Sequence, residues 1–168
     1  GIAMGTGAVS GFVVDIPGDQ VRNHGAIAIG DTSRADDLNA LALGVEANAR
    51  AGSATAIGDG AVANEDAEDG LAVGSSARVT AENASAFGQS AEATEADALA
   101  VGSGASAQGE SASAVGHDAR ALEQNASAFG QGAQALHQGS VALGSAAVTA
   151  EAVGTAQATI DNVTYEYA

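Results

Sequence analysis

The stretch Asn39-Ala40-Leu41-Ala42-Leu43-Gly44 returns 14 residues later as Ser53-Ala54-Thr55-Ala56-Ile57-Gly58. The two copies share Ala, then a large apolar residue, then Gly, and nine copies of this phrase form one series. Seven of the eight steps in the series are 14 residues long, and the step from Gly58 to Gly74 is 16. A further copy, Ala3-Met4-Gly5, precedes the series. A period this strict predicts stacked supersecondary units rather than a globular domain built around a pocket.

Numbering the repeat so that its Gly is position 14 aligns the other positions as well. The repeat glycines are Gly30, Gly44, Gly58, Gly74, Gly88, Gly102, Gly116, Gly130 and Gly144. After Ile29, the large apolar residues at position 13 are Leu43, Ile57, Val73, Phe87, Val101, Val115, Phe129 and Leu143. Position 12 is Ala in every regular copy, and positions 3, 5 and 10 are nearly always small.

Small residues two positions apart indicate β-strands, because the side chains on one face of a strand recur with a period of two. We therefore predict an all-β fold with two short strands per repeat, near positions 2–5 and 10–14, joined by two turns. Position 9 is always Asn, Asp, Ser or Gly, which favour turns, and Gly at position 14 permits a backbone geometry that a Cβ would forbid. A helix is the competing interpretation, since Ala favours helices and 14 residues are two heptads, but a coiled coil needs apolar spacings of three and four.

The two strands differ in their second faces. Position 4 is polar in all but one copy, so that strand is expected to face water; its residues are Arg34, Asn48, Val62, Arg78, Glu92, Ser106, Arg120 and Gln134. The strand at positions 10–14 is apolar on both faces, as a doubly buried strand is. One face packs inside the roll, and the other forms an apolar stripe that we expect identical copies to bury around a common axis. The position-13 residues are the candidates for this packing or seam, while the sequence alone leaves open which face, small or large, meets the partner.

Composition excludes several functions. The chain has 168 residues, a net charge of −16 and five basic residues, all of them Arg, so it repels nucleic acid and anionic lipid headgroups. Cys is absent, which excludes disulfides and thiolate sites. No Ser/His/Asp or paired-carboxylate cluster stands out from the repeat, so we expect no enzymatic activity, cofactor or metal. No apolar run approaches the roughly 18 residues of a membrane span, and we expect the chain itself not to enter a membrane.

The repeats resemble the head repeats of YadA-like trimeric autotransporter adhesins of Gram-negative bacteria, whose phrase is close to Asn-Ser-Val-Ala-Ile-Gly. The resemblance covers about residues 25–150. It rests on Asn39–Gly44 and Gly139–Gly144, with looser copies at Asn83–Gly88 and Asn125–Gly130. It implies a left-handed parallel β-roll assembled as a homotrimer, which sits on a coiled-coil stalk and is held at the bacterial surface by a C-terminal outer-membrane anchor. It also implies binding to host extracellular matrix or cell surfaces.

Two insertions break the period. The first lies within residues 12–22 and holds the only Pro; a Pro-Gly turn between apolar runs predicts a hairpin or projecting loop. This segment either caps the roll or contacts a ligand, and Phe12, Asp15 and Arg22 are the candidate contacts. The second yields Asn64-Glu65-Asp66-Ala67-Glu68-Asp69-Gly70, whose oxygens suit Ca²⁺, although the spacing matches no EF-hand loop. We expect a solvated acidic bulge there.

The frame also fails after Gly144, where residues 159–167 become richer in β-branched and aromatic side chains. This segment is either a terminal cap or the first strand of a further module. We therefore divide the chain into 1–24, an incomplete first coil with an inserted loop; 25–150, the head repeats; and 151–168. The chain begins within a repeat phrase, Gly1–Gly5, so we expect it to be a piece of a longer protein.

An adhesion module fits the pattern, because repeats offer a long multivalent face and assembly multiplies weak contacts. The main alternative is a structural spacer in a surface fibre with no ligand of its own. A trimeric acyltransferase built on a β-helix fits less well, because its coils are hexapeptides and 14 is not a multiple of six. An ice-binding solenoid would need a regular Thr face, and Thr is scattered here.

Overall fold

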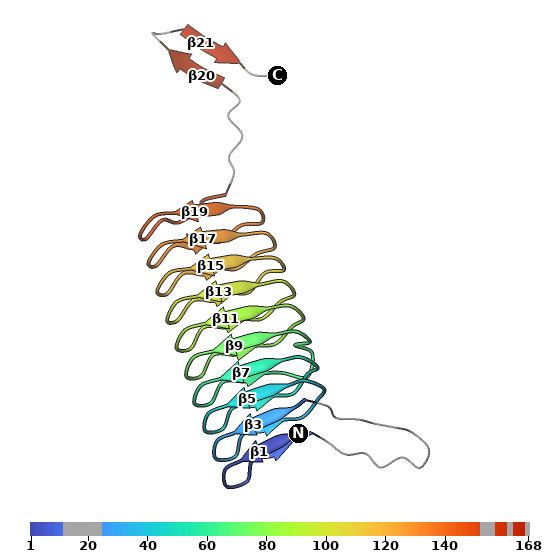
Figure 1. Ribbon diagram of the computed structural model, residues 1–168. Coiled ribbons are helices and arrows are strands. Elements are labelled where there is room, and N and C mark those ends of the chain that lie inside the picture. The colour runs from blue at the N-terminus through green and yellow to red at the C-terminus, as the bar shows by residue number, and fades with distance from the viewer. Residues whose placement is uncertain (12–24, 152–156, 161–162, 167–168) are drawn as a thin grey trace, which may run out of the picture.

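The computed structural model describes residues 1–11, 25–151, 157–160 and 163–166. The first two ranges form a solenoid in which each coil supplies one three-residue strand and one two-residue strand (Figure 1). The three-residue strands occupy positions 11–13 of the repeat and the two-residue strands positions 4–5, within the predicted ranges. The parallel β-roll of 14-residue coils expected from the sequence is confirmed.

The three-residue strands form a ten-stranded parallel sheet, which we name sheet 1. They are β1 (Ile2–Met4), β3 (Ile27–Ile29), β5 (Leu41–Leu43), β7 (Thr55–Ile57), β9 (Leu71–Val73), β11 (Ser85–Phe87), β13 (Leu99–Val101), β15 (Ser113–Val115), β17 (Ser127–Phe129) and β19 (Val141–Leu143). The two-residue strands form a nine-stranded parallel sheet, which we name sheet 2. They are β2 (Val9–Ser10), β4 (Arg34–Ala35), β6 (Asn48–Ala49), β8 (Val62–Ala63), β10 (Arg78–Val79), β12 (Glu92–Ala93), β14 (Ser106–Ala107), β16 (Arg120–Ala121) and β18 (Gln134–Ala135).

Equivalent repeat positions lie beside one another along both sheets. Ala42 pairs with Ala56, and Ala56 pairs with Ala72 across the 16-residue coil, so the two extra residues leave the register unchanged. A parallel ladder in constant register places like residues in straight rows, about 4.8 Å apart from strand to strand. Each row of the repeat is therefore a continuous feature of the surface or of the core.

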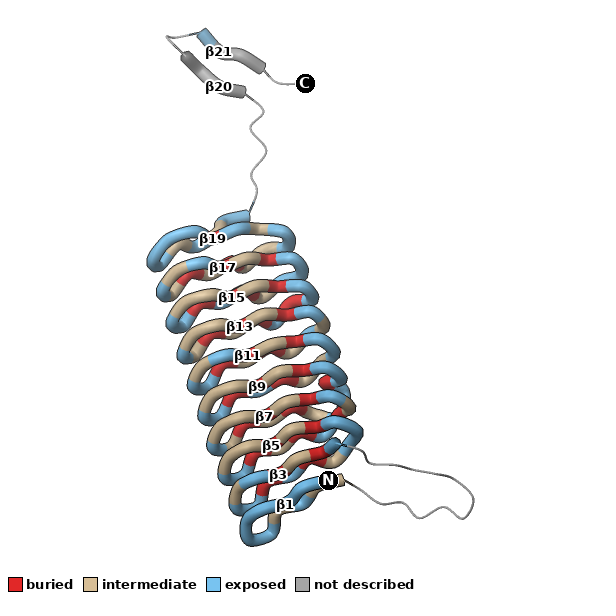
Figure 2. Tube along the Cα trace, in the orientation of Figure 1, coloured by how far each residue is buried: buried red, intermediate tan, exposed pale blue. Residues whose placement is uncertain are grey.

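The core between the two sheets is built almost entirely of Ala. Figure 2 shows that buried residues recur from coil to coil along the roll. Ala side chains at positions 10 and 12 of sheet 1 meet those at positions 3 and 5, and nearly all are fully buried. Among the described residues, Val79 is the largest fully buried side chain. It lies opposite Gly70, which occupies position 10 of the preceding coil, where most coils have Ala. A Cβ added at Gly70 would lie 3.0 Å from Val79 Cγ1 and 2.8 Å from the Ala67 carbonyl oxygen. The larger residue at one position is thus compensated by the smaller one facing it.

The first turn of each coil, at positions 14 to 3, depends on its Gly. Gly44 has φ +134°, and a Cβ there would lie 2.5 Å from the Gly58 carbonyl oxygen of the next coil. The turn closes with the Ala47 amide donating to the Gly44 carbonyl at 3.3 Å. The Glu46 amide donates to the backbone carbonyl of Asp31 in the previous coil at 2.9 Å. Glu46 itself has φ +57°. Position 2 therefore also adopts the left-handed conformation, which the sequence analysis did not identify.

The second turn, at positions 6 to 10, has its left-handed residue at position 9, as its turn-forming composition predicts. Ser53 has φ +55°, and its amide donates to the Leu38 carbonyl of the previous coil at 2.8 Å. The two extra residues of the 16-residue coil lie in this turn. The insertion at residues 12–24 also interrupts the chain here, because Gly11 occupies position 6 and Gly25 position 9. Both insertions therefore interrupt the second turn and leave the first turn intact.

The last coil replaces core Ala by a hydrogen-bonded pair. Ser140 stands at position 10, and its hydroxyl donates to the His137 carbonyl at 2.6 Å and lies 3.2 Å from Thr149 Oγ1. Thr149 Oγ1 also accepts the Leu136 amide at 2.9 Å. These bonds satisfy backbone and hydroxyl groups at the end of the described coils.

The C-terminal segment contains an antiparallel hairpin of β20 (Gln157–Ile160) and β21 (Val163–Glu166), in which Gln157 pairs with Glu166. The sequence predicted a strand in this segment. The expected alternatives of a cap and a further module remain open. No helix among the described residues is long and apolar enough to cross a membrane.

Candidate interaction surfaces

The structure shows which face of each sheet 1 strand points away from the core. Ala42 and Ala56 at position 12 are fully buried, whereas Leu43 and Ile57 at position 13 point away from the core and are half-buried. Phe87 and Phe129 are 37% and 38% exposed. The small residues therefore face the core, and the position-13 residues that the sequence identified lie on the outside of the roll.

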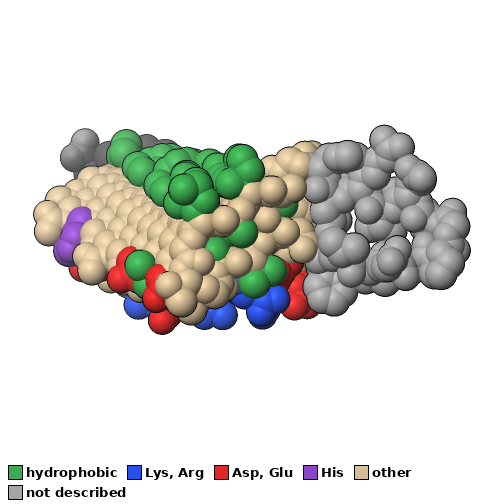
Figure 3. Space-filling model, turned by 60° about the horizontal axis from the view of Figure 1, so that its bottom comes forward, with side chains coloured by type: hydrophobic (Ala, Val, Ile, Leu, Met, Phe, Trp, Pro, Cys, Tyr) green, Lys and Arg blue, Asp and Glu red, His purple; other side chains and the backbone are tan. Residues whose placement is uncertain are grey.

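Position 11 lies on the same outward face and adds a second row. From β3 onward its residues are either apolar or hydroxyl-bearing: Ile27, Leu41, Thr55, Leu71, Ser85, Leu99, Ser113, Ser127 and Val141. Together with position 13 they form what we name the apolar band, from β1 to β19. Figure 3 shows hydrophobic side chains gathered in one band along the molecule, with the charged side chains on another side. Within the described chain, nothing covers this band.

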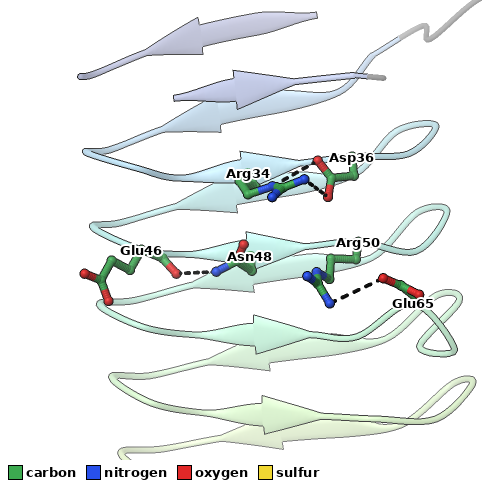
Figure 4. Close-up of polar contacts among 6 residues, drawn as sticks. All are labelled: Arg34, Asp36, Glu46, Asn48, Arg50 and Glu65. Atoms are coloured by element: carbon green, nitrogen blue, oxygen red, sulfur yellow. Dashed lines mark hydrogen bonds and ion pairs between the residues drawn. The ribbon is translucent and has the colours of Figure 1, made fainter. Parts of the chain in front are cut away.

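The outward face of sheet 2 is polar, as position 4 predicts. Position 6 contributes a second outward row that the sequence analysis did not include. Arg34 at position 4 is bound by Asp36 at position 6, through Nε to Oδ1 at 3.4 Å and Nη2 to Oδ2 at 3.0 Å (Figure 4). In the next coil Arg50 Nη1 lies 3.4 Å from Glu65 Oε1, and Asn48 Nδ2 donates to the Glu46 carbonyl at 2.8 Å (Figure 4). These contacts are largely exposed, so they contribute little to stability.

The second turn carries the acidic insertion. Glu65, Asp66, Glu68 and Asp69 are exposed, and Ala67 is fully buried and anchors the bulge to the core. Beside the bulge is an open cavity of about 390 Å³, which is lined by Asp37, Leu38, Asn39, Ala51, Gly52, Ser53, Glu65 and Glu68. No group of three or more His, Cys, Asp or Glu side chains in the described ranges is arranged to hold a metal ion. A solvated acidic bulge accounts for this segment.

The candidate contact loop lies outside the described residues. Phe12, Asp15 and Arg22 all fall within 12–24, so their role as ligand contacts stays a prediction. Of the residues that the sequence singled out, the structure brings together two sets: the repeat glycines along the first turn and the position-13 residues along the apolar band. The sequence signal that could have revealed position 6 is the continuation of the period of two beyond position 5.

A long β-solenoid with rows of identical residues and with two chemically different faces defines a repeat protein that acts through its surface. The model of the YadA head domain repeat matches residues 23–47, 66–91, 80–105, 93–119, 107–132 and 121–147. Because these matches cover more than half of the sequence, the chain belongs to the YadA head domain family. The family and the fold are those of an adhesin domain and not of an enzyme family.

A solved structure agrees with this assignment. The crystal structure of the collagen-binding domain of the Yersinia adhesin YadA superimposes with a TM-score of 0.51 at 25% sequence identity. The match covers 74% of this chain and 60% of that domain, so the chain spans about three fifths of the solved domain's length. No curated protein sequence matches the chain.

Proposed function

We propose that this domain is the head of a trimeric autotransporter adhesin, and that three copies pack through the apolar band. The observation that carries the proposal is the band itself. It runs the length of the roll and presents Val, Ile, Leu and Phe outward in every coil, from Ile29 to Leu143. Monomeric proteins rarely expose a continuous apolar surface of this extent. A stripe parallel to the roll axis is best covered by identical copies around a common axis.

The ligand proposed for the head is a protein of the host extracellular matrix or cell surface. The related YadA domain is described as collagen-binding, and triple-helical collagen is therefore the first ligand to test. We propose that the protein is displayed on the bacterial surface through a C-terminal outer-membrane anchor beyond this sequence. We also propose the division into 1–24, 25–150 and 151–168, with residues 25–150 as the adhesive repeats.

The experiment is a solid-phase binding assay with the 168-residue chain on collagen, fibronectin and laminin. Two versions are compared: the wild-type chain, and one in which residues 12–22 are replaced by a short Gly/Ser turn. Binding of the wild type to at least one ligand supports the adhesin. Retention of binding in the replaced version places the contact on the roll, and loss places it within residues 12–22, where Phe12, Asp15 and Arg22 are the candidate contacts. A trimer that binds none of the three supports the spacer instead.

A further inference from the structure

The arginines in the described part of this acidic chain are concentrated on one face. The net charge is −16 and there is no Lys, yet all four arginines among the described residues project from sheet 2 or its margin: Arg34, Arg50, Arg78 and Arg120. In the described coils, positions 4 and 6 carry only two carboxylates, Asp36 and Glu92, and Glu65 of the second turn lies against Arg50. Sheet 2 therefore has an excess of positive charge, while the second turn beside it is strongly acidic.

Three of these arginines form a regular row. Arg34, Arg78 and Arg120 all occupy position 4, and the parallel register places exactly two strands between successive members. With strands about 4.8 Å apart, the Cα atoms of neighbouring arginines in the row are about 14 Å apart, and the row is about 29 Å long. A straight row of this length suits an extended or rod-shaped ligand that lies parallel to the roll axis.

The three side chains differ in how they are held. Asp36 binds Arg34 through two contacts, whereas Arg78 has Val62 and Glu92 as its strand neighbours. Arg120 lies between Ser106 and Gln134, with no carboxylate beside it in the sheet. Among the described residues, no carboxylate lies within 4.0 Å of the Arg78 or Arg120 guanidinium. Their donors are exposed and arranged for the paired acceptors that carboxylates offer.

We infer that sheet 2 is the ligand-binding face of the head, and that Arg34, Arg78 and Arg120 bind carboxylates of a rod-shaped protein ligand lying along the roll. This inference rests on the proposed adhesin function and names the surface that performs it. It agrees with the proposed trimer, because burial of the apolar band leaves sheet 2 facing outward. The acidic second turn repels an acidic ligand from the edge of the roll and confines it to the sheet. A polyproline II chain rises about 3.1 Å per residue, so the row spans roughly three Gly-X-Y triplets of a collagen-like ligand.

The test uses triple-helical peptides immobilised at equal density, one with Glu in three consecutive triplets and a matched peptide with Gln in their place. The variant is Arg34→Gln, Arg78→Gln and Arg120→Gln combined. Its matched control is Glu82→Gln, Glu95→Gln and Glu110→Gln on the second turn. Melting temperature and molar mass establish that each variant is folded and assembled as the wild type is. An exposed ion pair changes affinity by roughly two- to fivefold, so the combined variant is expected to lose tenfold or more.

The expected result is that the wild type prefers the Glu peptide and that the arginine variant loses both binding and preference. The control variant keeps the preference and binds at least as tightly as the wild type, because it weakens the repulsion by the second turn. Among single variants, Arg120→Gln loses most and Arg34→Gln least, because Arg34 is already bound by Asp36. An arginine variant that binds like the wild type overturns the inference and leaves the adhesin function standing. A wild type that binds neither these peptides nor collagen overturns both. Arginine-dependent binding of sulfated polysaccharide without peptide binding overturns the assignment of a protein ligand.

Discussion

The two sheets of the roll share one core and differ on their outer faces. On sheet 1, alternation between Ala inside and Leu43 or Val101 outside leaves an apolar band. On sheet 2, the same alternation places Ala49 inside and Asn48 outside, and its outer face is polar. The core is nearly identical on both sides, so it cannot be what distinguishes their roles. We therefore propose that the outward positions 4, 6, 11 and 13 carry the function of this domain, while positions 3, 5, 10, 12 and 14 determine the fold.

The largest effect is expected from placing a charge in the apolar band. Val101→Asp would bring carboxylates together near the axis of the proposed trimer, at a cost of about 3–5 kcal/mol per copy for a buried unpaired charge. We expect assembly to be lost, as measured by light scattering on a size-exclusion column. The control is Ser106→Asp, which adds the same charge to sheet 2 and should leave the molar mass unchanged. If both variants had the same molar mass, the apolar band of sheet 1 and the outer face of sheet 2 would not differ in their role in assembly.

The next largest effect is expected at the shared first turn. Gly102 has φ +132°, and a Cβ there would collide with the Gly116 carbonyl of the next coil. Gly102→Ala should therefore reduce the free energy of unfolding by about 3 kcal/mol, through strain and displaced backbone. Urea denaturation measures this change. Gly132→Ala is the control, since Gly132 has φ +63° and open space around it, and about 1 kcal/mol is expected there. A smaller loss for Gly102→Ala than for Gly132→Ala would contradict the role of close approach.

A smaller effect is expected within the core that both sheets share. Gly70→Ala should cost about 1–3 kcal/mol, because its Cβ would press on Val79 and on the Ala67 carbonyl. Val79→Ala leaves a small cavity, and we expect the double variant to be more stable than the sum of the single effects predicts. A double-mutant cycle from thermal unfolding gives this coupling. Simple additivity would show that the two residues do not compensate one another.

The smallest effect is expected at the C-terminal end of the roll. Thr149→Val removes the acceptor of the Leu136 amide and the contact with Ser140. About 1 kcal/mol of stability should be lost, and the Leu136 amide should exchange with solvent faster in a hydrogen-exchange experiment. Thr149→Ser keeps the hydroxyl and should restore the protection of that amide. If Val and Ser behave alike, Thr149 does not cap the last coil.

The positions of the strands could be predicted because the same pattern of small and apolar residues occurs in nine successive copies of the repeat. The period of two in small residues predicted both strands, and Asn or Ser at position 9 predicted a left-handed turn that Ser53 and Asn83 adopt. Position 2 escaped prediction because residues such as Glu46 and Ala146 have no preference for φ > 0 and are held there by the neighbouring coils. The exchange of size between Gly70 and Val79 also escaped, because it joins two different repeat positions in successive coils.

The surfaces were less predictable than the fold. Sequence alone left open whether Ala or the larger residue at position 13 faced the core, because both alternations give an apolar strand. The structure places Ala inward, since an Ala-lined core lets two short strands approach closely. Phe12, Asp15 and Arg22 lie in an insertion outside the described residues, and their role as ligand contacts stays a prediction. Arg34, Arg78 and Arg120 already share position 4 in the sequence, and the parallel register shows that they form a straight row on one face.

The apolar band of sheet 1 is proposed as an interface between three copies. Sedimentation equilibrium of the wild-type chain over a wide concentration range measures this assembly. The chain has a mass of 16.1 kDa, and packing through the band predicts a single species of three times that mass that persists on dilution. A stable monomer at all concentrations, with the band exposed to solvent, would contradict it.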